Sequence, residues 1–327
     1  MKYEVADCID AGTEFCPCHL AEAGECILCS QLHGKNFCDC INWKGVCIYK
    51  EYVDNGNKPK PQRKSYLCQV VKKQDIEENL IIYSISVPHK LARDLIHPGA
   101  YVFLHHPSTN SFYDMPISVM DVDSEENIIK LAIETKGVKT KTLSNIDENS
   151  KIMLRGPFWN GVFGLKNIYT SREGTSVIIA KGIGMAPMIP VLKKLYSNGN
   201  KIYIFMDKDP YDSIFIENYL EKYDCTVIPC SILSDGDLSP QFKDMLMAFI
   251  EKHDVNLIHC DCVDIITLKL IDILGEKLKM SCCNNTKMCC GEGICGACTT
   301  RYSGRRVKRL CKYQSDPQNV FEGRRFI

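Results

Sequence analysis

The chain lacks the features that would place it among nucleic-acid binders or membrane proteins. Its 40 lysine and arginine residues balance 40 aspartate and glutamate residues, so it has no surplus of positive charge for nucleic acid or anionic lipid. It has no apolar run near the roughly 18 residues of a membrane helix, and its acidic, cysteine-rich amino terminus does not resemble a signal peptide. We expect a cytoplasmic protein with no membrane span and no nucleic-acid partner.

Cysteine, by contrast, is present in excess. Of 20 cysteines in 327 residues, eight lie within residues 8–47 and seven within residues 282–311. Disulfides are disfavoured in a reducing cytosol, and a chain long enough for a large central core needs no cross-links at both ends. Dense thiolates in that compartment favour metal or iron–sulfur ligation. The composition therefore predicts redox work in a strongly reducing cell.

The first half of the chain changes character twice. Residues 1–54 show little periodicity, so bound metal would have to supply much of the stability of this cysteine-rich module. Residues 55–64 are polar, contain proline and are predicted to be a linker. Residues 65–170 contain short segments rich in β-branched and aromatic residues, separated by Pro, Gly, Asn and Asp. That pattern predicts a small antiparallel β-barrel.

The second half alternates apolar runs with helical patterns. Residues 176–180 form a continuous apolar run, as expected for a strand buried on both faces, and a helical pattern over 187–198 follows. Further strands are expected at 201–206, 225–229 and 255–260, and helices at 212–222, 239–252 and 263–278. Residues 171–280 are therefore predicted to form an α/β domain with a doubly wound parallel sheet. Residues 281–327 form a last segment, rich in cysteine and glycine.

Four cysteines of the last segment have the spacing C-x4-C-x2-C-x12-C: Cys290, Cys295, Cys298 and Cys311. This spacing is typical of plant-type [2Fe–2S] proteins. Three glycines between the ligands would allow the positive φ angles of a tight wrap: Gly291, Gly293 and Gly296. Zinc is the alternative, but zinc sites usually pair two short knuckles, so we predict a [2Fe–2S] cluster. Cys289 is an alternative ligand to Cys290.

The amino-terminal cysteines form C-x-C and C-x2-C pairs that could also bind metal. The candidate ligands are Cys16, Cys18, Cys26, Cys29, Cys38, Cys40 and Cys47. Such pairs place two thiolates on one ion or on one edge of a cluster. With Cys8 they would fill two four-ligand sites, or one cluster with residues to spare. We predict at least one additional iron–sulfur cluster, with zinc as the alternative, and His19 is either a ligand or a neighbouring donor.

Short glycine-containing turns in the central parts could bind phosphate groups. The loop Gly137-Val-Lys139-Thr140 could cradle a diphosphate through backbone N–H groups, although barrel turns use glycine in any case. Gly182-Ile-Gly184 lies between a predicted strand and a predicted helix, where dinucleotide phosphates can approach the backbone. Asp207, at the end of the next strand, could accept a ribose 2′-OH and favour NAD over NADP, or be a cap or loop residue.

A barrel, a nucleotide-type sheet and a [2Fe–2S] segment in this order resemble the ferredoxin–NADP reductase superfamily over about residues 65–320. Within it, the chain is most similar to electron-transfer subunits of dihydroorotate dehydrogenase and to small subunits of bifurcating ferredoxin–NADP transhydrogenases. The resemblance implies that the barrel binds FAD, or FMN, and that the sheet receives NAD(P)H. It also implies that the cluster passes electrons to a partner subunit, so we expect a hetero-oligomer.

The resemblance assigns candidate flavin-binding residues. Met115-Pro116-Ile117-Ser118 stands where the family has Arg-x-[Tyr/aliphatic]-[Ser/Thr], which implies that Ser118 hydrogen-bonds the isoalloxazine. The family's phosphate-pairing arginine is replaced by Met115, and Lys136, Lys139 or Arg155 could supply the missing charge. Two loops resemble the family's Gly-x-Gly-Thr and Gly-Pro-x-Gly-Asn-Gly motifs, with the matching residues Gly137, Lys139, Thr140, Gly156, Pro157 and Asn160.

The end of the last predicted strand departs from the family pattern. The family has Cys-Gly-Pro there, and this chain has Cys260-Asp261-Cys262. The resemblance places Cys260 beside the nicotinamide, whereas Asp261 adds bulk and negative charge where the family's glycine leaves room. Two functions remain open: an electron-transfer subunit linking NAD(P)H, flavin and iron–sulfur clusters to a partner oxidoreductase or ferredoxin, and a non-catalytic iron–sulfur relay or scaffold with a degenerate flavin and nucleotide site.

Overall fold

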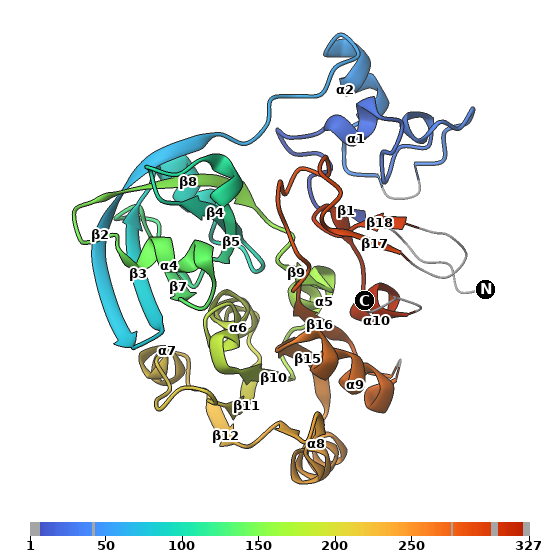
Figure 1. Ribbon diagram of the computed structural model, residues 1–327. Helices are drawn as coiled ribbons and strands as arrows, with labels where there is room; N and C mark the ends of the chain where they lie inside the picture. Colours follow the sequence, from blue (N-terminus) through green and yellow to red (C-terminus); the bar gives the residue numbers. More distant parts are fainter. Residues whose placement is uncertain (1–6, 41–42, 276, 302–306, 323–327) are drawn as a thin grey trace. The chain divides into compact units, whose positions relative to one another are not determined.

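The computed structural model describes residues 7–40, 43–275, 277–301 and 307–322, which divide into two compact units. The first unit comprises Met1–Ser65, Thr286–Ser315 and Asn319–Ile327, and the second comprises Tyr66–Asn285 and Asp316–Gln318. Both cysteine-rich ends of the chain therefore contribute to the first unit, whose blue and red segments run side by side in Figure 1. The predicted ranges 1–54 and 281–327 also include residues outside the described part.

A seven-stranded antiparallel sheet in the order β5-β4-β8-β2-β3-β7-β6 occupies the part of the second unit where we predicted a barrel. Its antiparallel character is confirmed, whereas closure into a barrel stays a prediction. Its strands are β2 (Ser65–Glu77), β3 (Leu80–Ser86), β4 (Tyr101–His105), β5 (Met115–Ser118), β6 (Asp121–Asp123), β7 (Ile128–Glu134) and β8 (Lys151–Phe158). The helices α3 (His89–Asp94) and α4 (Val138–Ser144) lie in its connections.

The alternation of side chains along these strands explains why one face of the sheet is buried. On β7, Ile129, Leu131 and Ile133 are at most 1% exposed and join one hydrophobic cluster. Lys130, between them, points to the other face, because successive side chains of a strand alternate. The two faces therefore pack in different places: one lines this cluster, and the other carries Lys130 together with Ala132, which joins the cluster around α6.

The six-stranded sheet β12-β11-β10-β15-β16-β9 confirms the predicted α/β arrangement. Five of its strands are parallel, and only β9 runs antiparallel, against β16. The strands are β9 (Val162–Phe163), β10 (Thr175–Lys181), β11 (Lys201–Asp207), β12 (Thr226–Pro229), β15 (Val255–Asp261) and β16 (Met280–Cys283). Strand β16 thus extends this sheet into residues that the sequence assigned to the cluster segment.

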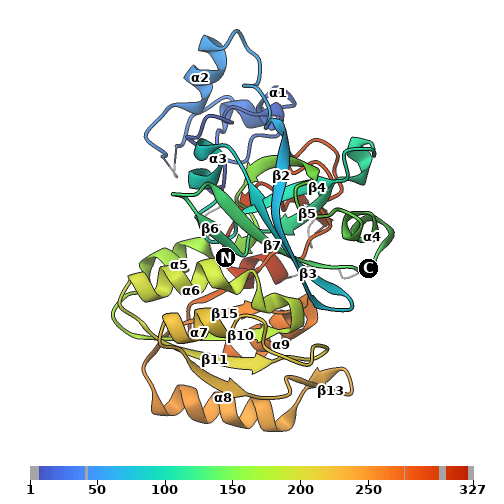
Figure 2. The ribbon, with the colours of Figure 1, turned by 90° about the vertical axis from the view of Figure 1, so that its left-hand side faces the viewer.

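Helices cover both faces of this sheet, and Figure 2 shows α5 and α6 on one side with α8 on the other. Ile178 and Ile204 belong to the same buried cluster as α6. On the opposite face, Phe205 packs edge-on against Phe242 of α8, with ring centroids 5.9 Å apart. The helices are α5 (Leu165–Thr170), α6 (Met188–Ser197), α7 (Glu217–Lys222), α8 (Pro240–Lys252) and α9 (Asp264–Leu274), and the turn η3 (Gly182–Met185) precedes α6.

The first unit has short elements and little apolar core. Strand β1 pairs with β19, and β17 pairs with β18, so strands from both ends of the chain lie in it. Its elements are β1 (Asp7–Cys8), α1 (His19–Glu22), η1 (Gln31–His33), α2 (Ile48–Asp54), β17 (Thr299–Arg301), β18 (Val307–Arg309) and β19 (Tyr313–Gln314), and α10 (Pro317–Phe321) follows. Across the described ranges, no helix has the length and apolar character to cross a bilayer.

Candidate functional site

The loop that starts at Cys290 turns its backbone toward its own cysteine sulfurs. The N–H groups of Glu292 and Cys295 donate to Cys290 Sγ at 3.3 and 3.5 Å, and the N–H of Ala297 donates to Cys295 Sγ at 3.5 Å. The three glycines of the loop have φ angles of +70°, +78° and +76°, as predicted. Such N–H···S bonds tune iron–sulfur centres, so the donor set and its backbone fit a [2Fe–2S] cluster.

The hairpin of β17 and β18 closes the twelve-residue spacing between the last two cysteines. It begins directly after Cys298, and the N–H of Leu310 donates to the Cys298 carbonyl at 3.2 Å. The neighbouring Cys311 is 2% exposed, and its thiol hydrogen-bonds Cys298. That bond lowers the pKa of Cys298 to about 6 and raises the pKa of Cys311, so the pair favours one thiolate. Three predicted ligands thus lie near one another, because Cys290 also acts electrostatically on Cys311.

Four amino-terminal cysteines form one electrostatically linked group: Cys16, Cys18, Cys26 and Cys29. The N–H of Cys29 donates to Cys26 Sγ at 3.4 Å. Burial, together with the nearby Cys18 and Cys26, raises the pKa of Cys16 to about 12. The pKa of Cys26 is also raised, by burial, so Cys16 and Cys26 would release their protons readily only if a cation replaced them, which is the behaviour of a metal ligand.

A second group of amino-terminal cysteines is more exposed. The sulfurs of Cys38 and Cys40 are 3.3 Å apart, and their hydrogen bond raises the pKa of Cys40 to about 11. Cys47 caps α2 by accepting from the N–H of Lys50 at 3.5 Å. Within the described ranges, no three His, Cys, Asp or Glu side chains are arranged to hold a single metal ion. The ligand assignments at both ends of the chain therefore stay predictions.

A cluster of four buried charges joins the two ends of the chain inside the first unit: Asp10, Arg63, Glu292 and Lys312. Arg63 donates to Asp10 at 2.6 Å and to Glu292 at 2.8 Å. Lys312 donates to the same two carboxylates, at 2.9 Å to Glu292. The neighbouring cations lower the pKa of Asp10 to about 2 against the effect of burial. Two cations and two anions balance, which is why all four charges can be buried.

Strand β5 presents the predicted flavin-binding residues on its outer side. Met115 is buried in the sheet's apolar cluster and Ile117 packs against it, whereas Pro116 and Ser118 are exposed. Strand β5 ends the strand order of its sheet, and such a position accepts a proline because no partner needs its N–H. Pro116 and Ser118 are therefore free to contact a bound ring.

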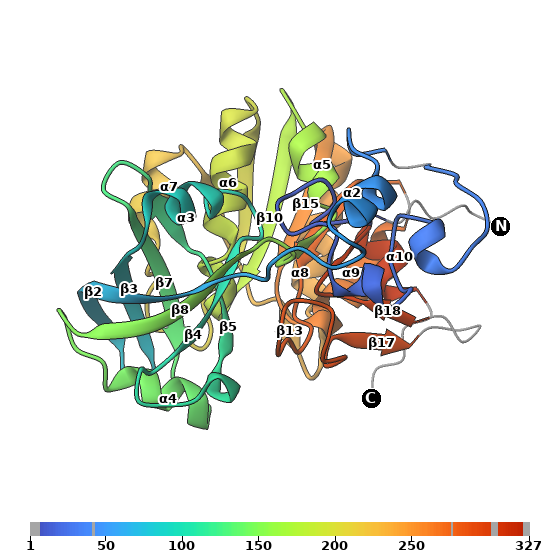
Figure 3. The same ribbon diagram turned by 90° about the horizontal axis from the view of Figure 1, so that it is seen from above.

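Helix α4 lies beside β4 and β5 in both Figure 2 and Figure 3. Lys139 of α4 donates to the carbonyls of Phe112 and Asp114 at 2.6 and 3.0 Å, directly before β5. Thr140 accepts from the N–H of Gly137 at 3.1 Å. Two of the predicted flavin-binding segments, α4 and β5, therefore lie together, and the hydrogen bonds of the Lys139 ammonium group connect them.

Arg155 and Lys136, the other two residues that could replace the family's arginine, each pair with a carboxylate. Arg155 donates to Asp114 at 2.9 and 3.1 Å and lies over the ring of Phe103. Lys136 forms an ion pair with Glu134 at 2.8 Å, although its side chain is largely exposed. A flavin phosphate could recruit Lys136 without breaking a buried contact, whereas Arg155 is held inside its sheet.

The loop after β8 packs closely on the backbone. The N–H of Gly161 donates to the Gly99 carbonyl at 2.8 Å, and a Cβ on Gly161 would lie 2.6 Å from that oxygen. Asn160 is fully buried, and its carbonyl accepts from the Asn284 side chain at 2.7 Å. Gly156 and Pro157 lie near the end of β8, where a Cβ on Gly156 would lie 3.1 Å from a valine methyl group. Close backbone packing is thus one reason for the glycines of this motif.

The turn between β10 and α6 is pressed against the end of β15. A Cβ on Gly184 would lie 1.9 Å from the carbonyl oxygen of Asp261, so no side chain fits at this position. Gly182 has φ +56°, a region that favours glycine. Asp261 is fully buried, its Oδ2 bonds His259 Nε2 at 2.6 Å, and its Oδ1 has no partner within the described structure. An acidic group therefore lies where the resemblance implied open space.

Asp207 and Cys260 are both occupied by neighbouring groups. The Asp207 carboxylate is 6% exposed and accepts from Lys181 Nζ at 2.8 Å and from the N–H of Ile232 at 3.0 Å. Cys260 is fully buried and accepts from Thr267 Oγ1 at 3.4 Å. Their assignment to a ribose and a nicotinamide stays a prediction.

Sequence reasoning missed a group of thiols beside Cys260. Strand pairing places Cys260 opposite Cys282, and the pKa of Cys262 is raised by burial first, then by Cys260 and Cys283. His259, opposite Ser281, bonds its hydroxyl at 2.8 Å. Pairing of β15 with β16 creates this group, and a sequence signal existed only in the cysteine pairs 260/262 and 282/283.

Comparison with protein families shows that residues 67–163 match the oxidoreductase FAD-binding domain. Among curated proteins, the chain is 26% identical over 237 residues to a dihydroorotate dehydrogenase B (NAD+) electron transfer subunit of Fusobacterium nucleatum, covering 69% of this chain and 88% of the relative. It is 27% identical over 232 residues to the protein of the same name from Clostridium acetobutylicum, covering 71% and 87%.

Solved structures give the same assignment of fold. An NADH-dependent reduced ferredoxin–NADP oxidoreductase aligns with a TM-score of 0.61 and 22% identity, over 77% of this chain and 87% of that chain. The ferredoxin reductase of carbazole 1,9a-dioxygenase aligns with a TM-score of 0.51 and 13% identity, over 67% and 69%. The resemblance inferred from the sequence is confirmed, since the chain is homologous to these electron-transfer subunits and has a ferredoxin-reductase-like fold.

Proposed function

We propose that this chain, with its oxidoreductase FAD-binding domain and ferredoxin-reductase-like fold, is the electron-transfer subunit of a flavin-dependent oxidoreductase. It moves electrons between NAD(P)H, FAD and iron–sulfur clusters, to or from a catalytic partner subunit or a ferredoxin. The observation that carries the proposal is the loop at Cys290, whose N–H groups point at a cysteine sulfur in a chain that also matches an FAD-binding domain. Relatives named as electron transfer subunits support it.

The chain's own residues divide the work among three places. Pro116 and Ser118 contact the flavin from the outer side of β5, and Thr140 lies on the adjacent helix that Lys139 fastens to the strand. The turn at Gly182 and Gly184 receives the nucleotide phosphates. FAD, when bound, links two-electron hydride transfer to one-electron transfer, and no side chain needs to act as a general base.

The [2Fe–2S] cluster is held by Cys290, Cys295, Cys298 and Cys311 in this proposal. The amino-terminal thiols hold an additional cluster, with zinc as the alternative, in the same unit as the carboxy-terminal ligands. Leu20, close to the amino-terminal ligands, packs against Gly293 of the Cys290 loop, where a Cβ would lie 3.1 Å from the leucine. Two metal centres in one small unit suit the passage of single electrons between them.

A second function, a non-catalytic iron–sulfur relay or scaffold, is favoured by two side chains. Asp261 is fully buried at the end of β15, where a nicotinamide would need room, and Met115 replaces the arginine that pairs the flavin phosphate. In this alternative the flavin and nucleotide sites are degenerate, and only the clusters function. The two candidates share the iron–sulfur centres and differ in whether NADH delivers electrons.

Anaerobic titration of the flavin-reconstituted chain with NADH and with NADPH separates the two functions. If the chain is an electron-transfer subunit, an equimolar amount of NADH or of NADPH should bleach the flavin absorption. If the chain is a relay or scaffold, chemical reductants should reduce the clusters, and neither nucleotide should change the absorption spectrum. If the chain binds no flavin and no iron while it remains folded, both functions are excluded.

A further inference from the structure

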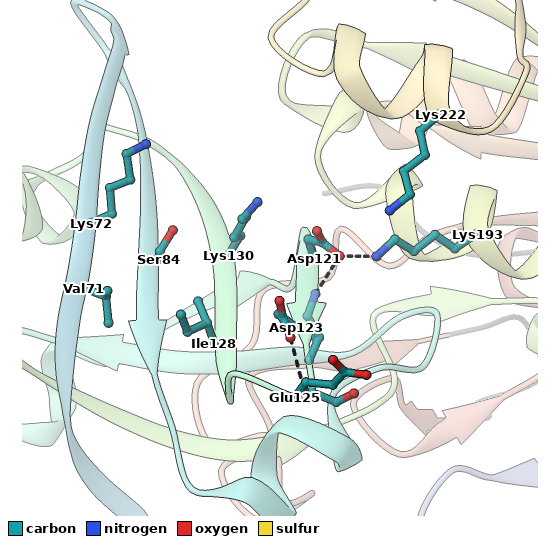
Figure 4. Close-up of a pocket in the computed structure, with 12 residues that line it drawn as sticks. Val71, Lys72, Ser84, Asp121, Asp123, Glu125, Ile128, Lys130, Lys193 and Lys222 are labelled. Carbon is teal, nitrogen blue, oxygen red and sulfur yellow. Dashed lines mark hydrogen bonds and ion pairs between the residues drawn. The ribbon is translucent and has the colours of Figure 1, made fainter.

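A pocket of about 500 Å³ lies in the second unit, away from every residue assigned above. Its volume is within the usual range of small-molecule sites. Residues of β2, β3, β6 and β7 form one wall, and the helices α6 and α7 supply the other. Figure 4 shows the lining side chains, which are Val71, Lys72, Ser84, Asp121, Val122, Asp123, Ser124, Glu125, Ile128, Lys130, Lys193 and Lys222.

The pairing of the strands places a serine between two lysines on the sheet wall. Lys72 of β2 lies opposite Ser84 of β3, and Ser84 lies opposite Lys130 of β7. Residues directly opposite one another in antiparallel strands point to the same face, so the three side chains form one row. Figure 4 shows them side by side, with Lys222 extending toward them from the helix wall.

Ser84 has a hydroxyl that is open to the pocket. The residue is 6% exposed, and within the described structure its hydroxyl takes part in no hydrogen bond, although it faces the pocket. The oxygen keeps access to the pocket, so it can exchange a bound water for a ligand. An acceptor inside the pocket would take a hydrogen bond from this hydroxyl.

The lysines of this row form no ion pair within the described structure, although strand pairing places Asp121 opposite Lys130. Asp121 is held by Lys193 and by the hydroxyl of Tyr219, which donates to it at 2.7 Å. Lys130 makes only a 3.4 Å contact with that same hydroxyl and a distant contact with its ring. Lys72 forms no ion pair within the described structure. Positive charge therefore collects around Ser84, whereas Asp123 and Glu125 lie at the opposite margin of the pocket (Figure 4).

We propose that this pocket binds the phosphate group of a small phosphorylated metabolite. The hydroxyl of Ser84 and the ammonium groups of Lys72, Lys130 and Lys222 donate to its oxygens, and lysine serves as a point charge for phosphate. The pocket is larger than one phosphate ion. The space beyond the phosphate reaches the carboxylates at the far margin, which suit hydroxyl donors of a sugar or polyol. The site uses no residue of the proposed flavin, nucleotide or cluster sites, so it stands independently of them.

Isothermal titration calorimetry on the purified full-length chain at low salt tests the proposal. The probes are ribose 5-phosphate, inorganic phosphate and ribose. We expect ribose 5-phosphate to bind, ribose alone to give no heat, and added salt to weaken binding because the contacts are ionic. Tighter binding of the ester than of inorganic phosphate supports a phosphorylated metabolite as the ligand. Equal affinity for both supports recognition of the phosphate group alone.

Variants identify the site. Ser84→Ala should weaken ribose 5-phosphate binding by about 10- to 100-fold, the effect of one hydrogen bond to a charged group, and Lys72→Gln or Lys130→Gln should weaken it similarly. Lys201→Gln, an exposed lysine on β11 outside the pocket, is the matched control and should bind as the original chain does. Absence of binding by the original chain would overturn the proposal. So would unchanged affinity in Lys72→Gln, whose exposed side chain can be replaced without loss of folding.

Discussion

Arg63 donates from its guanidinium to the carboxylate of Glu292, 229 residues later in the chain, at 2.8 Å, and both side chains are buried. Glu292 belongs to the Cys290 loop, and Arg63 also binds Asp10 near the first cysteines. The contact therefore fastens both cysteine-rich ends into one unit. That arrangement places every proposed iron–sulfur ligand in the same compact part of the protein.

Replacing the arginine should destabilise this unit strongly. Arg63→Met leaves two buried carboxylates with only Lys312 as counter-charge, and removal of one partner from a buried ion network costs about 3–5 kcal/mol. The measurement is chemical denaturation of the anaerobic protein, followed by loss of cluster absorbance. Lys58→Met, an exposed lysine of the same unit, is the control and should change stability by less than about 0.5 kcal/mol. Equal stability of both variants would show that the buried charges do not join the ends.

Much of the α/β sheet could be predicted because its strands are continuous apolar runs and its helices are periodic. The predicted strand 201–206 and helix 239–252 appear as β11 and α8 with ends shifted by one residue at most. The predicted helix 212–222 begins only at Glu217. The N–H groups of Asp212 and Ser213 are instead bound by the Glu77 carboxylate, a tertiary contact that no local pattern records.

The parts of the site that depend on distant pairing could not be predicted. Spacing predicted Cys290 and Cys311 as ligands, but nothing in the spacing indicates that Arg63 and Lys312 meet there. Asp207 reads as a ribose acceptor in the sequence, yet in the fold its oxygens accept from a lysine and two backbone N–H groups. Serine and lysine within strands form no recognisable sequence motif. Only the strand register shows that Ser84 lies between two lysines.

Gly184 should tolerate no side chain. Gly184→Ala places a Cβ 1.9 Å from a backbone oxygen, so the turn or β15 must shift, and overpacking of this kind costs about 1–3 kcal/mol. Gly137→Ala is the control, because its Cβ would meet nothing within 4 Å and its φ is −99°. Thermal denaturation of the second unit measures both. A Gly184→Ala chain as stable as the control would contradict the close approach of this turn to β15.

The ligand assignment at the carboxy terminus predicts a specific loss of iron. Cys295→Ser should remove about two iron atoms and two acid-labile sulfides per chain, because the whole [2Fe–2S] cluster depends on its four thiolates. Cys289→Ser changes an exposed neighbour of Cys290 and should keep the full content. Iron and sulfide analysis after anaerobic purification measures this. The reverse result would mean that Cys289 is the ligand in place of its neighbour or that the loop holds no cluster.

Removal of metal should unfold the first unit and spare the second. Both large hydrophobic clusters lie in the second unit, whereas the first has short elements and few buried apolar side chains. After iron chelation, limited proteolysis should therefore cut within residues 7–40 and 286–301 while a fragment near 66–285 persists. Before chelation both regions should resist. Cleavage that is identical with and without metal would show that the first unit is stable without it.

The electron paramagnetic resonance spectrum of the anaerobically purified chain, reduced with dithionite, tests the central claim most directly. A chain that carries single electrons through iron and sulfur should give the signal of a reduced [2Fe–2S] cluster, present in Cys289→Ser and lost in Cys295→Ser. A folded, iron-free preparation with no such signal would contradict the account.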